Sequence, residues 1–211
     1  MSADIESFGN FNVAACDHRC LNDLEKYKNL LIKWQKVQNL VSRETLNDIW
    51  CRHFSDSLQV LEYLPENTKN ILDIGSGGGF PAVPMAIALR GRPVVFHLLE
   101  ANRRKVSFLR AVSRELDLGL NVYNERAECV DVEKIGSVDV ITSRATAPLN
   151  VLFRLVFPFF SEKTVGIFHK GHEFGAELSE SRANWSFDVV RRVSKIDVSG
   201  VILEVRRLRP E

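Results

Sequence analysis

The feature that most constrains the fold is a glycine-rich stretch at residues 73–81, which reads Asp-Ile-Gly-Ser-Gly-Gly-Gly-Phe-Pro. Its first two residues end the short apolar run Ile71–Ile74, and a predicted helix follows the stretch. Glycine is needed where a backbone takes positive φ or lets a ligand come close. A strand, a glycine turn and a helix in this order are typical of an open α/β sheet that binds its ligand at the carboxyl ends of the strands.

The rest of the chain continues this alternation of strands and helices. Two further strands near the C-terminus are joined by a tight turn, which favours an antiparallel pair. Alternating strands and helices favour a parallel sheet that is covered on both faces. We therefore predict an α/β, Rossmann-like sheet of seven strands, mostly parallel, with an antiparallel last strand. Apart from the strand before the glycines, the predicted strands lie at residues 94–99, 120–123, 138–141, 164–168, 185–189 and 200–206.

The residues before the sheet show a helical pattern instead. Apolar residues recur at helical spacing from Leu21, and Thr45 is a candidate N-cap for a second helix that ends before Pro65. We therefore divide the chain into an N-terminal helical extension, residues 1–65, and a sheet domain, residues 66–211, packed as one compact unit.

Composition excludes several classes of protein. The chain has 211 residues, 28 Lys and Arg against 27 Asp and Glu, and 45% hydrophobic residues, so it is neither disordered nor a basic nucleic-acid tail. It has no apolar run long enough to span a membrane and no signal peptide, so we expect a cytoplasmic protein without membrane contact. We expect its four cysteines to be unpaired, reduced thiols and expect no metal site. These cysteines are Cys16, Cys20, Cys51 and Cys129.

The glycine loop also discriminates between two classes of cofactor. A dinucleotide-binding loop needs a third glycine where this chain has Phe80, and Pro81 removes a backbone N–H where a pyrophosphate would need a donor. Asp73 would place a negative charge close to that pyrophosphate. S-Adenosylmethionine (SAM) carries no phosphate, and its ammonium and sulfonium groups are attracted by a carboxylate. The loop therefore predicts SAM, bound near Asp73, Gly75, Gly77 and Phe80, rather than NAD.

Glu100 supports the same cofactor. It ends the second strand, where a carboxylate can accept hydrogen bonds from both ribose hydroxyls; the alternative is a surface acid at a strand end. Together, the loop, the acid and the order of elements predict a class I SAM-dependent methyltransferase, which would release S-adenosyl-L-homocysteine.

These residues and several further segments resemble one family, the ribosomal RNA small subunit methyltransferase G family, once called glucose-inhibited division protein B. The glycine loop is shared by many methyltransferases, whereas the combination of Arg-His-x-x-Asp-Ser, Ser-Arg-Ala and Gly-Phe-Pro is far more specific. Gly79 and Ala82 are small departures from the family pattern. The similar segments outside the loop are residues 39–42, 52–57, 104–109, 126–128, 143–145 and 170–171.

The resemblance implies a cytoplasmic bacterial enzyme that uses SAM. It would methylate N7 of guanosine 527, in the 530 loop of 16S rRNA, acting on the free RNA, the small ribosomal subunit or an assembly intermediate. The family's SAM contacts correspond here to Gly75, Phe80, Ala127, Glu128 and Arg144. The alternative is a SAM-dependent methyltransferase acting on another RNA, a protein or a small molecule; a non-catalytic SAM- or RNA-binding factor is a further possibility.

The chemistry needs few special groups. Guanine N7 already has a free lone pair, so transfer by in-line displacement requires alignment and no general base. Arg144, at the end of the fourth strand, would position substrate or cofactor, or form a structural pair with Asp73 or Asp56. Arg52 and Asp56 are spaced for a local salt bridge; alternatively, His53 and Asp56 close the helical segment over the cofactor pocket. We expect Arg52, His53 and Asp56 to form one pocket wall.

Clusters of basic residues are candidates for RNA contact. Arg103 and Arg104 begin a basic helix, and a further basic cluster lies near the C-terminus. Either cluster would contact phosphates or form an ordinary solvated surface. Lys170 and His172 follow the fifth strand, beside the crevice, and are better placed. Nothing in the sequence indicates a coiled coil, which favours a monomer.

Overall fold

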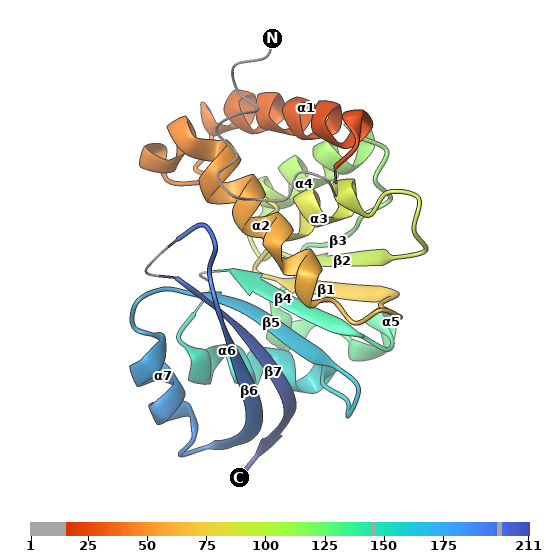
Figure 1. Ribbon diagram of the computed structural model, residues 1–211. Helices are drawn as coiled ribbons and strands as arrows, with labels where there is room; N and C mark the ends of the chain where they lie inside the picture. Colours follow the sequence, from red (N-terminus) through yellow and green to blue (C-terminus); the bar gives the residue numbers. More distant parts are fainter. Residues whose placement is uncertain (1–15, 145–146, 198–199) are drawn as a thin grey trace.

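A computed structural model of the chain describes residues 16–144, 147–197 and 200–211. Its centre is a seven-stranded sheet in the order β3-β2-β1-β4-β5-β7-β6 (Figure 1). β2 lies on one side of β1 and β4 on the other, so the strand order reverses at β1. The carboxyl ends of these three strands therefore surround one crevice. The strands are β1 (Asn70–Ile74), β2 (Val95–Leu99), β3 (Asn121–Tyr123), β4 (Val140–Arg144), β5 (Val165–Lys170), β6 (Trp185–Val193) and β7 (Val201–Pro210).

The direction of the strands confirms the prediction of a mostly parallel sheet with a reversed last strand. β1 pairs in parallel with β2 and β4, and β7 pairs antiparallel with both β5 and β6. The predicted hairpin forms an antiparallel edge of the sheet, in which β6 is outermost and β7 lies between β5 and β6. The reason is burial: residues 201–205 of β7 are all buried, whereas β6 carries the exposed Val190 and Val193.

Helices cover both faces of the sheet. Neighbouring strand residues point to opposite faces, so Ile71 and Leu98 belong to one core, and Leu72 and Leu99 to the other. The first core lies under α1, α3 and α4, and the second under α6 and α7 (Figure 1). The helices are α1 (His18–Gln35), α2 (Asp56–Leu58), α3 (Ala82–Ala88), α4 (Arg103–Glu115), α5 (Val132–Ile135), α6 (Leu149–Val156) and α7 (Phe174–Ser181).

The predicted second helix of the N-terminal region is interrupted. A 3-10 helix, Arg43–Asp48, is followed by a π-helical turn, Trp50–Ser55, then by α2 and a second 3-10 helix, Gln59–Tyr63. Thr45 is not the N-cap, because it lies inside the first 3-10 helix and its hydroxyl donates to the carbonyl of Ser42. Local hydroxyl bonds of this kind compete with regular helix. The wide π turn is typical of functional sites.

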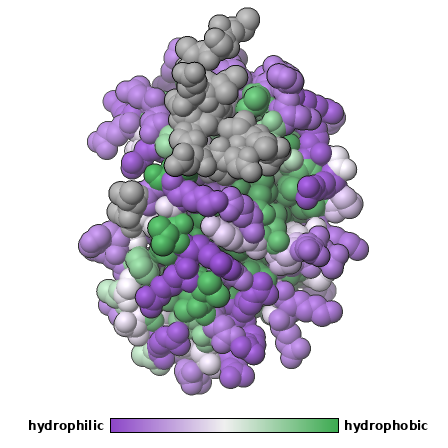
Figure 2. Space-filling model, in the orientation of Figure 1, coloured by the Kyte–Doolittle hydropathy of each residue, from purple (hydrophilic) through white to green (hydrophobic). Residues whose placement is uncertain are grey.

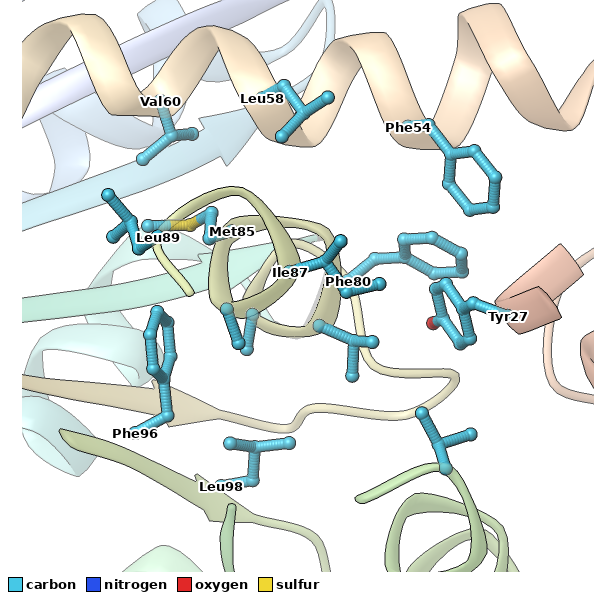
Figure 3. Close-up of a cluster of buried hydrophobic side chains, with 14 of the residues drawn as sticks. Tyr27, Phe54, Leu58, Val60, Phe80, Met85, Ile87, Leu89, Phe96 and Leu98 are labelled. Carbon is cyan, nitrogen blue, oxygen red and sulfur yellow. The ribbon is translucent and has the colours of Figure 1, made fainter. Parts of the chain in front are cut away.

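This helical segment packs on α3 and also contacts the sheet, where Nε2 of His169 on β5 donates to the carbonyl of Asp56 at 3.0 Å. Figure 3 shows Leu58 and Val60 facing Met85 of α3 and Leu89 just after this helix, with the strand residue Phe96 beneath them. Residues 82–87 of α3 are all buried, as expected for a helix with neighbours on every side. The side chains of the extension therefore share one hydrophobic core with the sheet domain.

The structure corrects the expectation of unpaired thiols at the N-terminus. Cys16 and Cys20 form a disulfide, with a Cα–Cα distance of 5.2 Å. Their spacing across one turn, with Asp17 capping α1 between them, brings the two sulfurs to the same side of the helix. Cys51 and Cys129 are free, as expected.

Other local predictions are confirmed. The side chain of Asn102 accepts hydrogen bonds from the amides of Arg104 and Lys105 and so caps α4. The face shown in Figure 2 is mainly hydrophilic, with smaller hydrophobic patches. Within the described part of the chain, no helix is long and apolar enough to cross a membrane.

Candidate cofactor and substrate site

A cavity of about 560 Å³ lies at the carboxyl ends of β1, β2 and β4. The glycine loop forms its floor, and the N-terminal helical segment forms the opposite wall. The predicted site residues that line it are His53, Gly75, Gly77, Phe80, Glu100, Ala127, Glu128 and Arg144. The sequence-based site is therefore assembled in one place from segments that lie far apart in the chain.

The glycine loop has the conformation that glycine permits. Gly75 and Gly77 have φ of 71° and 55°, values in the left-handed region. The amides of Gly75 and Ser76 both donate to the carbonyl of Leu99, at 2.9 and 3.1 Å. These bonds hold the loop against the end of β2. A side chain at Gly77 would reach toward the cavity, so glycine keeps this part of the floor open.

Glu100 joins the loop to the start of α4. One carboxyl oxygen accepts from the amide of Gly77 at 2.8 Å, and the other accepts from the amide of Asn102 at 2.7 Å. The residue is 8% exposed and lines the cavity. Each carboxyl oxygen can accept more than one hydrogen bond. Glu100 is thus held in a fixed position with acceptor capacity left for a ligand hydroxyl, rather than projecting from the surface.

Asp73 lies beneath the loop and is completely buried. One carboxyl oxygen accepts from the hydroxyl of Thr142 at 2.7 Å, and the other has no hydrogen-bond partner among the described residues. Burial raises the pKa of this carboxyl group to about 7. Asp73 does not belong to the cavity lining, so it supports the loop from below in place of the direct cofactor contact expected from the sequence.

The last two glycines of the loop make room for the N-terminal helices. The hydroxyl of Tyr27, on α1, donates a hydrogen bond to the carbonyl of Gly78. A Cβ atom at Gly79 would lie 2.8 Å from that hydroxyl, and one at Gly78 would lie 3.1 Å from the carbonyl oxygen of Leu40. The contact at Gly79 would be a clash and the one at Gly78 a tight contact, so these glycines allow the helical segment to approach the loop. From the sequence we related the glycines only to the cofactor, and this packing role was not predicted.

Phe80 joins an aromatic cluster at the cavity wall (Figure 3). Its ring lies 4.7 Å from that of His53 and 5.5 Å from that of Tyr27, measured between centroids. The guanidinium of Arg144 lies over the same ring at 4.9 Å. Cation–π contact and stacking therefore fix the positions of His53 and Arg144 together.

Arg144 is held by the N-terminal helical segment. Its Nη1 donates to the carboxyl group of Asp56 at 3.2 Å and to the carbonyl of Arg52 at 3.1 Å. Asp56 is therefore a partner of Arg144, which is one of the two structural pairings that the sequence suggested. The local Arg52–Asp56 salt bridge is not among the ion pairs of the described residues.

His53 continues this chain of contacts. Its Nδ1 accepts from Nη2 of Arg144, so Nε2 carries the proton and donates to the hydroxyl of Thr45 at 2.8 Å. Burial, together with the charge of Arg144, lowers the pKa of His53 to about 3. The neutral ring therefore positions the arginine and lines the cavity wall, whereas Asp56, predicted to act with it over the cofactor pocket, does not line this cavity.

A second cavity, of about 280 Å³, adjoins the first. His53, Arg144 and Thr45 line both cavities, whereas Arg52 and Asp56 line only the second. His169 also lines it; this residue is 8% exposed, and its Nδ1 has no hydrogen-bond partner among the described residues. The site thus consists of two adjoining spaces separated by Arg144 and His53.

The residues predicted to contact RNA lie in different environments. Lys170 is largely buried, forms an ion pair with Glu177 at 2.6 Å and lines the second cavity. His172 is exposed beyond β5, and Arg103 and Arg104 are exposed at the start of α4. The sequence analysis did not select Lys105, although it lines the first cavity. The cap at Asn102 fixes where α4 begins and therefore which face of the helix carries Lys105. This cap could be recognised in the sequence.

Comparison with known proteins identifies the family. A family model described as rRNA small subunit methyltransferase G matches residues 20–202. The chain belongs to this family. Similar proteins include the ribosomal RNA small subunit methyltransferases G of Brucella ovis and Bartonella tribocorum. The first is 40% identical and covers 99% of this chain and 98% of its own; the second is 39% identical, with coverages of 93% and 92%.

Solved structures show the same fold at low sequence identity. An O-methyltransferase from Bacillus cereus in complex with SAH has a TM-score of 0.62 and 16% identity, and covers 96% of this chain and 100% of its own. An O-methyltransferase, described as putative, from Klebsiella pneumoniae has a TM-score of 0.58 and 17% identity, with coverages of 93% and 94%. The fold is that of class I SAM-dependent methyltransferases, and the cofactor of this family member is SAM.

Proposed function

We propose that this enzyme transfers a methyl group from SAM to N7 of guanosine 527 in the 530 loop of bacterial 16S rRNA. Membership of the rRNA small subunit methyltransferase G family supports the rRNA substrate. The observation that carries the proposal is the pair of adjoining cavities, which provides separate spaces for a methyl donor and an acceptor on the two sides of Arg144.

The first cavity fits the cofactor. The open floor at Gly77 and the fixed acceptors of Glu100 suit the adenosine part of SAM. Ala127 and Glu128 lie in a short 3-10 helix at the rim and would contact its base. Asp73 lies beneath the loop, and its carboxyl group, in the ionised form, would attract the cationic groups of SAM. When bound there, SAM supplies a methyl group on a sulfonium, which leaves readily.

The residues around the second cavity would position the acceptor. Arg144 lies between the two cavities, held by Asp56 on one side and by the ring of Phe80 on the other. Its guanidinium can donate to guanine O6, the commonest partner of arginine on a guanine edge. The target base must leave its stack to enter the cavity. Since guanine N7 carries a free lone pair, alignment of the two partners is sufficient and no general base is assigned.

We also propose where the enzyme acts and in what form. A substrate in 16S rRNA places the reaction in the cytoplasm, where ribosomal subunits are assembled. The free RNA, the small subunit and an assembly intermediate are each compatible with this role. A monomer is the simplest form, since a single chain supplies both cavities.

The experiment that tests this function uses radiolabelled SAM. Purified enzyme is incubated with 16S rRNA or small subunits from cells that lack the endogenous activity, with cell protein and small metabolites as alternative acceptors. Label that enters 16S rRNA and is released by ribonuclease supports the proposal. Label that remains in protein or small molecules after ribonuclease treatment would support the alternative substrate classes and refute it.

A further inference from the structure

The basic residues of this chain differ in whether their charges are neutralised. In the C-terminal cluster, Arg192 and Arg206 both pair with Glu204 at 3.0 Å, and Arg207 pairs with Asp188. Lys170 is similarly paired with Glu177. These cations already have a carboxylate partner, so binding a phosphate would require competition with it.

Another group of cations has no such partner. Lys36, Arg43, Arg104 and Lys105 have no carboxylate oxygen within 4.0 Å among the described residues. The first three are exposed, and Lys105 is half-buried. Their positive potential is therefore available to a ligand.

The structure brings these four residues together in one groove. Its volume is about 600 Å³, and it lies between the end of α1 and the start of α4. The other lining residues are amides and one valine, without any acid. In the sequence, the N-terminal helical segment and α4 are about 70 residues apart, so only the fold reveals this cluster.

The groove is held in shape and leads to the cofactor cavity. The side chain of Gln35 donates to the carbonyl of Val41 at 2.9 Å and accepts from the amides of Leu40 and Val41 at 2.8 and 3.1 Å. These bonds fix the turn that carries Lys36 and Arg43. Lys105 lines both the groove and the cofactor cavity, and Leu40 and Val41 of the same turn line the cofactor cavity, so the two spaces adjoin here.

We propose that this groove binds the phosphate backbone of the RNA substrate beside the target nucleotide. The inference rests on the proposed function and adds that the N-terminal helical segment, together with α4, holds the RNA. Unpaired cations gain most from phosphate contact, because they release bound counterions without breaking an ion pair. Backbone contacts of this kind set the position of the RNA and leave the choice of base to the cavities.

The test compares two triple variants of equal charge. The groove variant combines Lys36→Gln, Arg43→Gln and Arg104→Gln, and leaves Lys105 intact because it lines the cofactor cavity. The control variant combines Arg192→Gln, Arg206→Gln and Arg207→Gln, all exposed positions of the C-terminal cluster whose side chains have a carboxylate partner. Each protein is assayed for methylation of undermethylated small subunits and for binding to an RNA oligonucleotide of the 530 loop at several salt concentrations. SAM affinity is measured by calorimetry.

We expect the groove variant to raise KM for the subunits roughly tenfold or more, with kcat and SAM affinity near wild type. The slope of log Kd for RNA against log salt should fall by about two, because three phosphate contacts are lost. The control variant should match wild type. An unchanged KM and salt slope in the groove variant, or an equal loss in the control, would overturn the inference. Failure of the wild-type enzyme to methylate any RNA would instead refute the proposed function.

Discussion

The hydroxyl of Tyr27, on the first helix, donates its hydrogen bond to the carbonyl of Gly78 in the SAM loop. Tyr27 is fully buried, and burial raises the pKa of its hydroxyl, so the proton stays available for donation. The N-terminal helical segment is thereby attached directly to the loop that forms the floor of the cofactor cavity. The N-terminal helical segment therefore shapes the cofactor site as well as covering the sheet.

We expect Tyr27→Phe to weaken SAM binding several-fold. The change leaves the carbonyl of Gly78 buried without its partner, at a cost of about 1–3 kcal/mol, and the loop loses its attachment to α1. Calorimetry with SAM and urea unfolding measure the two effects. Tyr123→Phe is the matched control, since this hydroxyl is bonded to His97 outside the cavities. SAM affinity equal to wild type in Tyr27→Phe would show that the bond serves stability alone.

Arg144→Ala should abolish methyl transfer and leave SAM binding largely intact. The substitution removes the group between the two cavities and leaves Asp56 without its charged partner. Arg144→Lys keeps the charge but lacks the planar fork that contacts both Asp56 and His53, so we expect it to restore only part of kcat. Circular dichroism checks the fold of both variants. Wild-type turnover by the alanine variant would contradict the role assigned to Arg144.

Glu100→Gln should lower SAM affinity by at least about tenfold. An amide has only one oxygen, so its NH₂ group must face one of the two amide donors of Gly77 and Asn102. The loop and the ribose acceptor are both disturbed. Isothermal calorimetry gives the affinity, with Glu115→Gln on the exposed side of α4 as the control. Equal SAM affinities in the wild type, Glu100→Gln and Glu115→Gln would show that Glu100 does not contribute to cofactor binding.

The buried Asp73 predicts an unusual dependence of stability on pH. Its pKa is about 7 in the folded chain against 3.8 for the free group, so the folded state holds the proton more tightly. The stabilisation is complete below about pH 4 and is lost as the pH rises through 7. Asp73→Asn should therefore flatten the fall in the free energy of unfolding between about pH 4 and pH 7, an effect of a few kcal/mol at most.

His53 contributes with the opposite sign, which makes a control variant possible. Its pKa is lowered from 6.5 to about 3, so its contribution is present above pH 6.5 and is lost as the pH falls toward 3. His53→Gln should alter the profile only below about pH 6.5 and leave the last part of the fall, between about pH 6.5 and pH 7.5, unchanged. Urea unfolding at each pH measures both variants. A wild-type pH profile in Asp73→Asn would show that this carboxyl group is already ionised at neutral pH.

The sequence was sufficient for features that depend on local chemistry. The strand before the glycine loop, the cap at Asn102 and the acid at Glu100 each combine a residue type with a position along the chain, and the structure places all three as predicted. The choice of SAM over NAD also depended on the residues of one loop. Ala145, part of the Ser-Arg-Ala motif that indicated the family, lies outside the described residues.

Features that depend on tertiary contact were predicted poorly. Asp56 lies 88 residues before Arg144, and the sequence named it only as one of two candidate partners, because no local pattern decides between Asp56 and Asp73. The tight packing at Gly78 and Gly79 depends on Tyr27 and Leu40 in a separate segment. The predicted helix after Thr45 changes to a π turn where its residues meet the cavity, since tertiary contacts there outweigh local propensity. The groove of unpaired cations likewise exists only in the folded chain.

The most direct test of the central claim is the identity of the methylated base. Small subunits lacking the modification are incubated with the enzyme and SAM, and the extracted 16S rRNA is cleaved chemically at 7-methylguanosine. The account predicts one new cleavage, at guanosine 527 in the 530 loop, which disappears with Arg144→Ala. Label on another base, or cleavage at another guanosine, would contradict it.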